Sequence, residues 1–337
     1  MPTIADVARA AGVSTATVSR VLNGNNEVDP LLAARVRIAV KDLAYRPSRI
    51  ARSLRTRRTM VWALIISDIR NPFFTDMVRG VEDVAYANGY SLVLCNSEEN
   101  VAKELDYLQL ALAENMAGVI VAPASLTQTN FDELLEQGVP VVTVDRKLSD
   151  DRVDRVLIDN SRGAEMAVSH LVSGGYRRIG CISGPITVST GADRLSGYRH
   201  GLRLNGLKAS AELIRFGDFR EESGAVAMKQ LLALRTPIDA VFVANNLMTL
   251  GALEAIAEAE LTVPDDMAVV GFDDMSWSRL LRPPLTTVAQ PTYDLGSETA
   301  RMLLSRISGY DGAPRELILS PTLRARASSA PAGAKSP

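Results

Sequence analysis

The segment from Thr15 to Arg20 combines small, hydroxyl-bearing and basic side chains within less than two turns of a predicted helix. Apolar Val18 and Val21 take the inner side of that helix. The side chains that then point largely outward are those of Thr15, Ala16, Thr17, Ser19 and Arg20. Hydroxyl and guanidinium groups hydrogen-bond to phosphates and to the edges of bases. This surface therefore predicts a contact with nucleic acid.

Three short helices are predicted to position this surface. Thr3 and Asp6 resemble a capping box that starts the first helix, and Gly12 supplies the turn after it. Ser14 caps the second helix, and Asp29-Pro30 opens the third. Two helices joined by a short turn containing Gly are typical of a helix-turn-helix, whose second helix enters the major groove. A three-helix protein-interaction module with a basic surface is the alternative.

The charge distribution divides the chain into two parts. Residues 1–58 contain 11 Lys and Arg against 4 Asp and Glu, whereas residues 59–337 contain 26 against 35. The net charge of −2 therefore hides a basic end, which suits a polyanion, and an acidic remainder. Between them, residues 46–55 contain Pro47, a potential cap at Ser48 and about two helical turns, too few for a stable isolated helix. Phosphates and a partner copy are expected to order that segment.

The basic end resembles the DNA-binding headpiece and hinge of the LacI/GalR family. The motifs that carry the resemblance are Thr3-Ile4-Ala5-Asp6-Val7-Ala8, Ala11-Gly12-Val13-Ser14, Thr17-Val18-Ser19-Arg20-Val21-Leu22-Asn23, Tyr45-Arg46-Pro47 and Ala51-Arg52-Ser53-Leu54. The resemblance implies that Thr15, Ala16 and Arg20 read bases and that Leu54 wedges into the minor groove at the operator centre. The expected DNA-binding set is Thr3, Ser14, Thr15, Ala16, Thr17, Arg20, Asn23, Arg49, Ala51, Leu54 and Arg55.

Behind residue 59 the pattern becomes an alternation of strands and helices. Buried strands are predicted at 61–66, 91–95, 118–121, 141–144, 179–182, 240–243 and 268–272, with helices at 73–87 and 101–114. Such a repeat favours a parallel sheet with helices on both faces. About 280 residues exceed one comfortable core, which favours two doubly wound lobes with a cleft between them. Ligands of such sheets bind outside the carboxyl ends of the strands.

The sequence contains no sign of an enzyme, and no cofactor or metal site is expected. It lacks the phosphate-binding G-x-x-x-x-G-K-[ST] and a G-x-G-x-x-G between a strand and a helix. His170 and His200 lie in polar helical stretches without catalytic or metal-ligand spacing, and Cys95 and Cys181 are predicted to be reduced core thiols. With no signal peptide and no apolar run near the roughly 20 residues of a membrane span, a cytoplasmic protein is expected.

Residues 61–325 resemble periplasmic sugar-binding proteins of the ribose type, as the sensor domains of the LacI/GalR family do. The resemblance implies that aromatic rings stack on a sugar and that polar side chains bind its hydroxyls. We expect each ligand-binding residue to lie where a predicted strand ends and a loop begins. The expected ligand set is Asn71, Phe73, Phe74, Asp145, Arg146, Arg194, Phe219, Asn245, Asp273 and Gln290. The chemistry agrees, because a sugar offers apolar C–H faces and a rim of hydroxyls.

Particular residues narrow the expected effector. Asp145 and Asp273 balance Arg146 and Arg194, so sugar acids and phosphosugars are disfavoured. Val188 stands where purine-sensing relatives carry a basic residue, which disfavours a nucleobase as co-repressor. Asn246 stands where an aspartate is usual in the family, so one carboxylate near the rim of the pocket is absent. A neutral pentose such as ribose, acting as inducer, fits best. A hexose, a polyol, a sugar acid, a partner protein, co-repression and an enzyme fused to a DNA-binding module remain alternatives.

The predicted organisation is an all-α helix-turn-helix headpiece followed by an α/β sensor of the periplasmic-binding-protein type. The headpiece spans residues 1–46, the hinge helix and linker 47–59, and the sensor and dimerisation domain 60–327. Lobe 1 comprises about 60–160 and 290–318, and lobe 2 about 161–289 and 319–327. A homodimer on a pseudo-palindromic operator is expected. The tail, residues 328–337, has no leucine heptads and is expected to be disordered.

Overall fold

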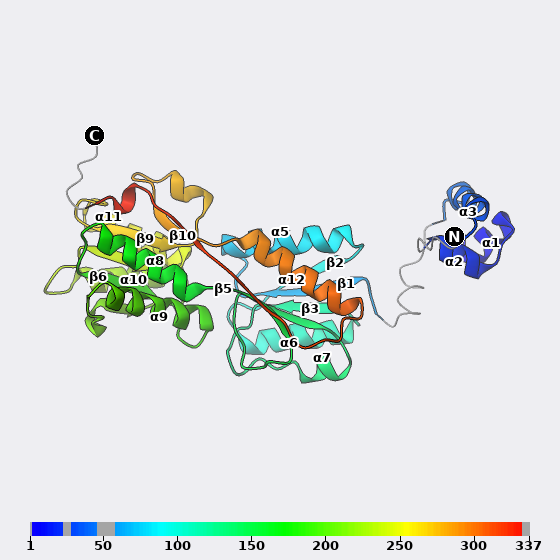
Figure 1. Cartoon of the computed structure of the whole chain (residues 1–337), viewed down its shortest axis with the longest axis horizontal. Coiled ribbons are helices and arrows are strands. Elements are labelled where there is room, and N and C mark those ends of the chain that lie inside the picture. Colours follow the sequence, from blue (N-terminus) through cyan, green and yellow to red (C-terminus); the bar gives the residue numbers. More distant parts are fainter. Residues whose placement is uncertain (1, 23–27, 46–57, 332–337) are drawn as a thin grey trace. The chain divides into compact units, whose positions relative to one another are not determined.

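The computed structural model describes residues 2–22, 28–45 and 58–331, which form two compact units, Met1–Thr59 and Met60–Pro337. The first unit contains helices α1 (Ile4–Ala11), α2 (Thr15–Leu22) and α3 (Pro30–Asp42) (Figure 1). The predicted starts of these helices are confirmed. Thr3 and Asp6 form a capping box, Ser14 Oγ accepts from Thr17 N–H at 3.1 Å, and Asp29 caps α3. Their buried contacts are made by Val7, Ala8, Ala11, Val18, Val36 and Ala39.

The second unit contains two six-stranded sheets, which define lobe 1 and lobe 2 (Figure 1). Lobe 1 has the strand order β11-β5-β4-β3-β1-β2 and is parallel throughout. Its strands are β1 (Val61–Ile66), β2 (Ser91–Asn96), β3 (Gly118–Val121), β4 (Val141–Val144), β5 (Asp154–Ile158) and β11 (Glu316–Leu319). Helices α5 (Pro72–Ala87) and α12 (Thr292–Ile307) cover one face, and α6 (Val101–Ala113) and α7 (Asp132–Glu136) cover the other.

Lobe 2 has the strand order β12-β10-β9-β8-β6-β7, in which only β12 runs antiparallel to its neighbour β10. Its strands are β6 (Ile179–Ser183), β7 (Ile214–Phe216), β8 (Ala240–Val243), β9 (Ala268–Phe272), β10 (Thr286–Ala289) and β12 (Thr322–Arg324). Its helices are α8 (Asn160–Ser173), α9 (Ser189–Leu204), α10 (Glu221–Leu232) and α11 (Asn246–Glu258). The predicted fold class, a helical headpiece with a two-lobed α/β domain, is confirmed.

The chain crosses between the lobes three times. The crossings follow β5, β10 and β11, so lobe 1 receives α12 and β11 only after most of lobe 2. The central strands β3, β4 and β8 are buried along their whole length, as expected of strands covered by helices on both faces. Most of the parallel strands end in a loop that leads into a helix, and β4 is an exception because its loop leads directly to β5.

The expectation of a disordered tail from residue 328 is wrong for its first residues. A short 3₁₀ helix, Ala327–Ser329, packs on lobe 2, and Ser328 and Ser329 are buried. Ser328 Oγ donates to the Val269 carbonyl at 2.7 Å, and Ser329 Oγ lies 2.7 Å from His170 Nε2. Composition alone suggested disorder, but these hydroxyls satisfy buried polar groups of the core. Residues 332–337 lie outside the described residues.

Candidate functional site

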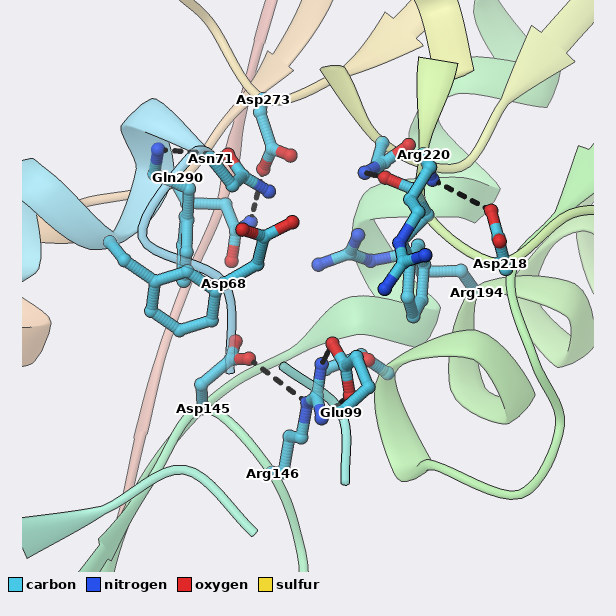
Figure 2. Close-up of a pocket in the computed structure, with 15 residues that line it drawn as sticks. Asp68, Asn71, Glu99, Asp145, Arg146, Arg194, Asp218, Arg220, Asp273 and Gln290 are labelled. Atoms are coloured by element: carbon cyan, nitrogen blue, oxygen red, sulfur yellow. Dashed lines mark hydrogen bonds and ion pairs between the residues drawn. The ribbon is translucent and has the colours of Figure 1, made fainter. Parts of the chain in front are cut away.

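All ten side chains of the expected ligand set line one pocket between the two lobes (Figure 2). Lobe 1 contributes the residues that follow β1 and β4, and lobe 2 those that follow β7, β8 and β9. Gln290 directly follows β10, at a crossing between the lobes. The pocket thus lies at the carboxyl ends of parallel strands, where ligands of open α/β sheets bind.

Three of the ten lie within helices and not where a strand ends, namely Phe73 and Phe74 in the first turn of α5 and Arg194 in α9. Arg194 lies inside helix α9, eleven residues beyond the end of β6, and not at a strand end. It reaches the pocket because the first turns of α9 face the cleft, where Thr190 also lines the cavity. A loop of residues 184–188 separates the end of β6 from the start of α9. The strand-end rule, which expects binding residues directly after a strand, does not predict a binding residue inside the helix.

Four further charged residues line the pocket and were missed. Asp68 follows β1, Glu99 follows β2, and Asp218 and Arg220 flank Phe219 after β7. Applying the strand-end rule to every strand would have found them. With these residues the pocket carries five carboxylates and three guanidinium groups, so its formal charge is −2 and not zero. The balance expected from Asp145, Asp273 and two arginines is therefore corrected to an acidic pocket.

Four pocket residues adopt a left-handed backbone conformation without being glycine. The φ angles are 61° for Glu99, 66° for Asp145, 68° for Phe219 and 76° for Asp273. Such a conformation costs of the order of 1–3 kcal/mol for a residue with a side chain, and most for a bulky one such as Phe. Each follows a strand directly or within three residues, and its side chain lines the cleft. Backbone strain of this kind is therefore stored in the wall of the pocket.

The Arg146 guanidinium is held by the protein on several sides (Figure 2). Its two amino groups donate to the Glu99 carboxylate at 2.5 and 2.6 Å, and one also donates to the Pro123 carbonyl at 3.2 Å. Its Nε lies 3.7 Å from Asp145 Oδ2. Burial alone would lower the pKa of Arg146, but the charge and hydrogen bonds of Glu99 outweigh it and raise the pKa. Arg146 therefore remains a fixed cation.

Asp145 and Asp273 are buried carboxylates with raised pKa values. Loss of solvent raises the pKa of Asp145 to about 6, although the charges of Arg146 and Arg194 act against the rise. Burial also raises the pKa of Asp273, opposed by Arg194 and by hydrogen bonds from Gln290 and the Asn246 N–H. Buried carboxylates with raised pKa values in a cleft are typical of functional sites.

Arg194 and Asn245 are fixed by contacts within lobe 2. Arg194 Nε donates to Asn160 Oδ1 at 2.7 Å, Nη1 donates to the Ala244 carbonyl at 2.6 Å, and the guanidinium lies 3.8 Å from the ring centre of Phe272. Asn245 caps α11 through Oδ1 and donates from Nδ2 to the Phe219 carbonyl at 2.9 Å. These contacts orient both side chains before any ligand arrives.

Three buried polar atoms of the pocket have no hydrogen-bond partner among the described residues. They are Asp145 Oδ1, Arg146 Nε and Gln290 Oε1. Buried polar groups are normally paired, and each exception requires an explanation. Two acceptors and one donor beside the aromatic rings of Phe73, Phe74 and Phe219 match a molecule with several hydroxyls and an apolar face.

On the headpiece, the structure leaves the expected base-reading side chains accessible. Thr15, Ala16 and Arg20 are exposed on α2, whereas Val18 is buried. Thr3, Ser14 and Thr17 form capping contacts at the starts of α1 and α2. The remaining expected DNA contacts, Asn23, Arg49, Ala51, Leu54 and Arg55, lie outside the described residues.

The histidines and cysteines take no part in the pocket. His200 is exposed, His170 is half-buried against Ser329, and both cysteines are free and buried. Within residues 2–22, 28–45 and 58–331, no group of three or more His, Cys, Asp and Glu is arranged to hold a metal ion. Over the same residues no helix has the length and apolar character needed to span a membrane.

Comparison with known proteins identifies relatives that span almost the whole chain. Residues 3–48 match the model for bacterial regulatory proteins of the lacI family, and residues 168–329 match the periplasmic binding protein-like domain. The chain is 36% identical over 330 residues to the ribose operon repressor of Escherichia coli (strain K12), covering 97% of this chain and 100% of that protein. It is 34% identical over 329 residues to the HTH-type transcriptional repressor PurR of Photobacterium profundum, covering 97% and 98%. The crystal structure of the lac repressor dimer bound to operator and the anti-inducer ONPF matches with a TM-score of 0.83 and 29% identity, over 98% of this chain and 99% of that one.

Proposed function

Because the chain belongs to the lacI family of bacterial regulatory proteins, we propose that it is a transcriptional repressor whose effector is a neutral pentose, D-ribose. The observation that carries the choice of effector is the set of unpartnered polar atoms beside three phenylalanines in the acidic pocket. A pentose offers hydroxyls to those atoms and C–H faces to the rings. A phosphorylated or acidic sugar would place a further negative charge among five carboxylates.

The proposed DNA contacts divide into base reading and positioning. Thr15, Ala16 and Arg20 face base edges in the major groove, and basic side chains of the headpiece contact phosphates. The hinge at 47–59 orders on the operator of a homodimer, where the paired Leu54 side chains open the central base step. The similar structure of the lac repressor dimer bound to operator supports the part of this proposal that places a dimer on the operator.

The proposed mechanism is a shift between two lobe arrangements. The sugar contacts residues of both lobes and so favours the closed cleft. Closure of the lobes alters the separation of the two hinges in the dimer and lowers operator affinity. A ligand changes that equilibrium only by its differential affinity for the two states, with a coupling of about 1–3 kcal/mol.

Thermal unfolding with a panel of ligands tests the choice of effector. D-Ribose at 100 times its dissociation constant is expected to stabilise the native protein by about 2.7 kcal/mol. The comparison set is L-arabinose, D-glucose, ribitol, D-gluconate and hypoxanthine at equal concentrations. A larger shift with any of these assigns the pocket to that ligand, and no shift with any of them favours a partner protein as effector. An operator-binding measurement with the active ligand then distinguishes induction from co-repression.

Ribose affinity is also expected to depend on pH through Asp145. An ionised Asp145 accepts hydroxyl hydrogen bonds that its protonated form loses, and its pKa is raised to about 6. Affinity should therefore fall roughly tenfold between pH 7 and pH 5. The effect of Asp145 on the stability of the fold has the opposite dependence on pH. Because the pKa of Asp145 is raised in the native state, Asp145 stabilises the native state at pH values below the ordinary pKa of an aspartate. This stabilisation is lost as the pH rises to about 6.

Calorimetry at the two pH values measures this effect, with circular dichroism to verify that the protein stays folded. Asp145→Asn removes this titrating group, so its weaker affinity should change less between pH 7 and pH 5 than the affinity of the parent does. A parent affinity that is equal at both pH values would contradict the assignment of Asp145 as a hydroxyl acceptor.

A further inference from the structure

We propose that Asn246 is a positioning residue that holds the two lobes together and so sets the effector concentration at which the protein responds. The inference rests on the proposed function for its effector, D-ribose. Asn246 is the first residue of α11 in lobe 2, only 1% of its surface is exposed, and it is not among the residues that line the pocket. Its role is therefore separate from direct contact with the sugar.

The side chain of Asn246 makes a buried hydrogen bond between the lobes. Its Nδ2 donates to Oδ1 of Asn71 at 2.9 Å. Asn71 belongs to lobe 1, where it caps α5 two residues before Phe73, the first of two adjacent phenylalanines that line the pocket. The bond thus connects the start of a lobe 1 helix to the start of a lobe 2 helix, at the edge of the cleft where both helices begin.

The direction of this hydrogen bond is fixed on both sides. Asn71 Oδ1 also accepts from the Phe73 N–H at 3.0 Å, so this capping contact requires its oxygen to stay in place. Asn246 Oδ1 accepts from the Leu247 N–H at 2.8 Å, which leaves its NH₂ group to face lobe 1. Neither amide can turn around without losing a backbone contact. Lobe 2 must therefore supply a donor at this point.

An aspartate at position 246 has the same shape but cannot donate. Its carboxylate would face the Asn71 oxygen, and it would add a negative charge beside Asp273, whose Oδ2 accepts from the backbone N–H of residue 246 at 3.3 Å. The contact with the Asn71 oxygen exists only while the lobes are close together, so it disfavours the closed state, whereas the repulsion from Asp273 acts within lobe 2 in both states. The asparagine amide therefore favours closure, and a carboxylate would oppose it.

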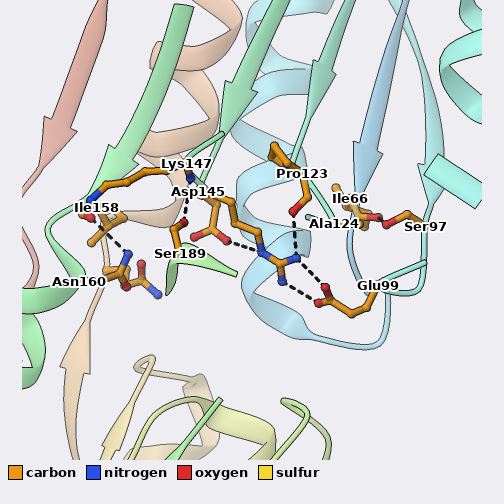
Figure 3. Close-up of polar contacts among 12 residues, drawn as sticks. Ile66, Ser97, Glu99, Pro123, Ala124, Asp145, Lys147, Ile158, Asn160 and Ser189 are labelled. Carbon is orange, nitrogen blue, oxygen red and sulfur yellow. Dashed lines mark hydrogen bonds and ion pairs between the residues drawn. The ribbon is translucent and has the colours of Figure 1, made fainter. Parts of the chain in front are cut away.

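The other side of the cleft has a second set of contacts between the lobes, which are more exposed. The Lys147 N–H of lobe 1 donates to Ser189 Oγ at 2.8 Å (Figure 3), and Lys147 Nζ lies 2.9 Å from Asp193 Oδ2. The side chains of that ion pair are 46% and 29% exposed, and exposed ion pairs contribute little. Among the described contacts across the cleft, the hydrogen bond from Asn246 to Asn71 is the buried one. The single substitution Asn246→Asp keeps the shape of the side chain and replaces the donor of this bond with an acceptor.

The test uses the full-length protein with D-ribose as the probe. Asn246→Asp and Asn246→Ala are compared with Asn130→Asp, which adds the same charge on the exposed surface of lobe 1 and keeps the oxygen that accepts from the Asp132 N–H. Calorimetry is expected to give a ribose affinity about tenfold weaker for Asn246→Asp, an intermediate loss for Asn246→Ala, and the parent value for Asn130→Asp.

Lobe separation is measured independently by electron spin resonance between labels on Glu136→Cys in lobe 1 and Lys208→Cys in lobe 2. Both positions are exposed, and the native cysteines are buried. Without ligand, Asn246→Asp should populate longer distances than the parent. Equal distances and equal ribose affinity in Asn246→Asp would overturn the inference, and if that variant unfolds, Asn246→Ala decides by the same two measurements. A parent that does not bind D-ribose contradicts the proposed effector, while the ligand-free distances still test Asn246.

Discussion

Replacing Asp273 with alanine is expected to abolish the response to D-ribose while leaving operator binding intact. The Asp273 carboxylate is buried, accepts from the Gln290 amide and the Asn246 N–H, and its charge acts on Arg194. Removing a buried, hydrogen-bonded carboxylate whose charge acts on a neighbouring buried cation costs about 2–5 kcal/mol of binding energy. At about 1.4 kcal/mol per tenfold, the affinity should fall between roughly 30-fold and several thousand-fold.

Phe73→Ala and Phe219→Ala extend the same experiment to the apolar faces of the sugar. Each removes an aromatic ring from the pocket, so each should weaken ribose binding without a change in charge. Asp311→Ala provides the matched control, because it removes a carboxylate from an exposed position in lobe 1 outside the pocket. Calorimetry with ribose and a gel-shift assay with the operator separate the two activities. Parent-like ribose affinity in all three pocket variants would disprove the assignment of the pocket.

Operator affinity is expected to fall at least about 10³-fold when salt rises from 50 to 200 mM. The headpiece and hinge carry 11 Lys and Arg against 4 Asp and Glu, and each neutralised phosphate contributes about −0.9 to the log–log slope. Six arginines, Arg35, Arg49, Arg52, Arg55, Arg57 and Arg58, are proposed to contact or approach phosphates. Six phosphates neutralised by one headpiece correspond to a slope of log affinity against log salt concentration of about −5, and the two headpieces of a dimer should make this slope steeper.

Fluorescence anisotropy over a salt series measures this slope. Arg35→Gln removes an exposed cation from the headpiece and should make the slope less steep, by about one for each phosphate contact that is lost. Arg203→Gln removes an exposed cation from lobe 2 and should leave the slope unchanged. A nearly flat dependence in the parent would show that phosphate contacts do not drive operator binding.

Much of the pocket could be predicted because strand ends and helix starts are local features of the sequence. A buried apolar run followed by Asp145-Arg146, or by Asp273, places these residues at the carboxyl end of a strand without any knowledge of the lobes. The buried central strands and the capped headpiece helices were predictable for the same reason. These features depend on neighbouring residues and not on tertiary contacts.

The residues that could not be predicted depend on how distant segments meet. The contact between Asn246 and Asn71 joins positions 175 residues apart, and its direction is set by two backbone N–H groups that only the folded chain places there. Arg194 reaches the pocket from within a helix, and the left-handed turn at Phe219 departs from the preference of its residue type. Ser328 and Ser329 appeared to belong to a polar tail because their buried partners lie in remote strands.

The three crossings between the lobes also constrain the order in which the protein can assemble during synthesis. Lobe 1 lacks its edge strand β11 and the covering helix α12 until residues 292–319 have left the ribosome, because both belong to its core although they follow lobe 2 in the chain. Strands β6 to β10 of lobe 2 emerge earlier as a continuous stretch. A nascent chain that ends just before α12, which begins at Thr292, therefore exposes the apolar face of α5 that α12 later covers. Translation pauses before residue 319 would prolong the interval in which that face is open to aggregation or to chaperones.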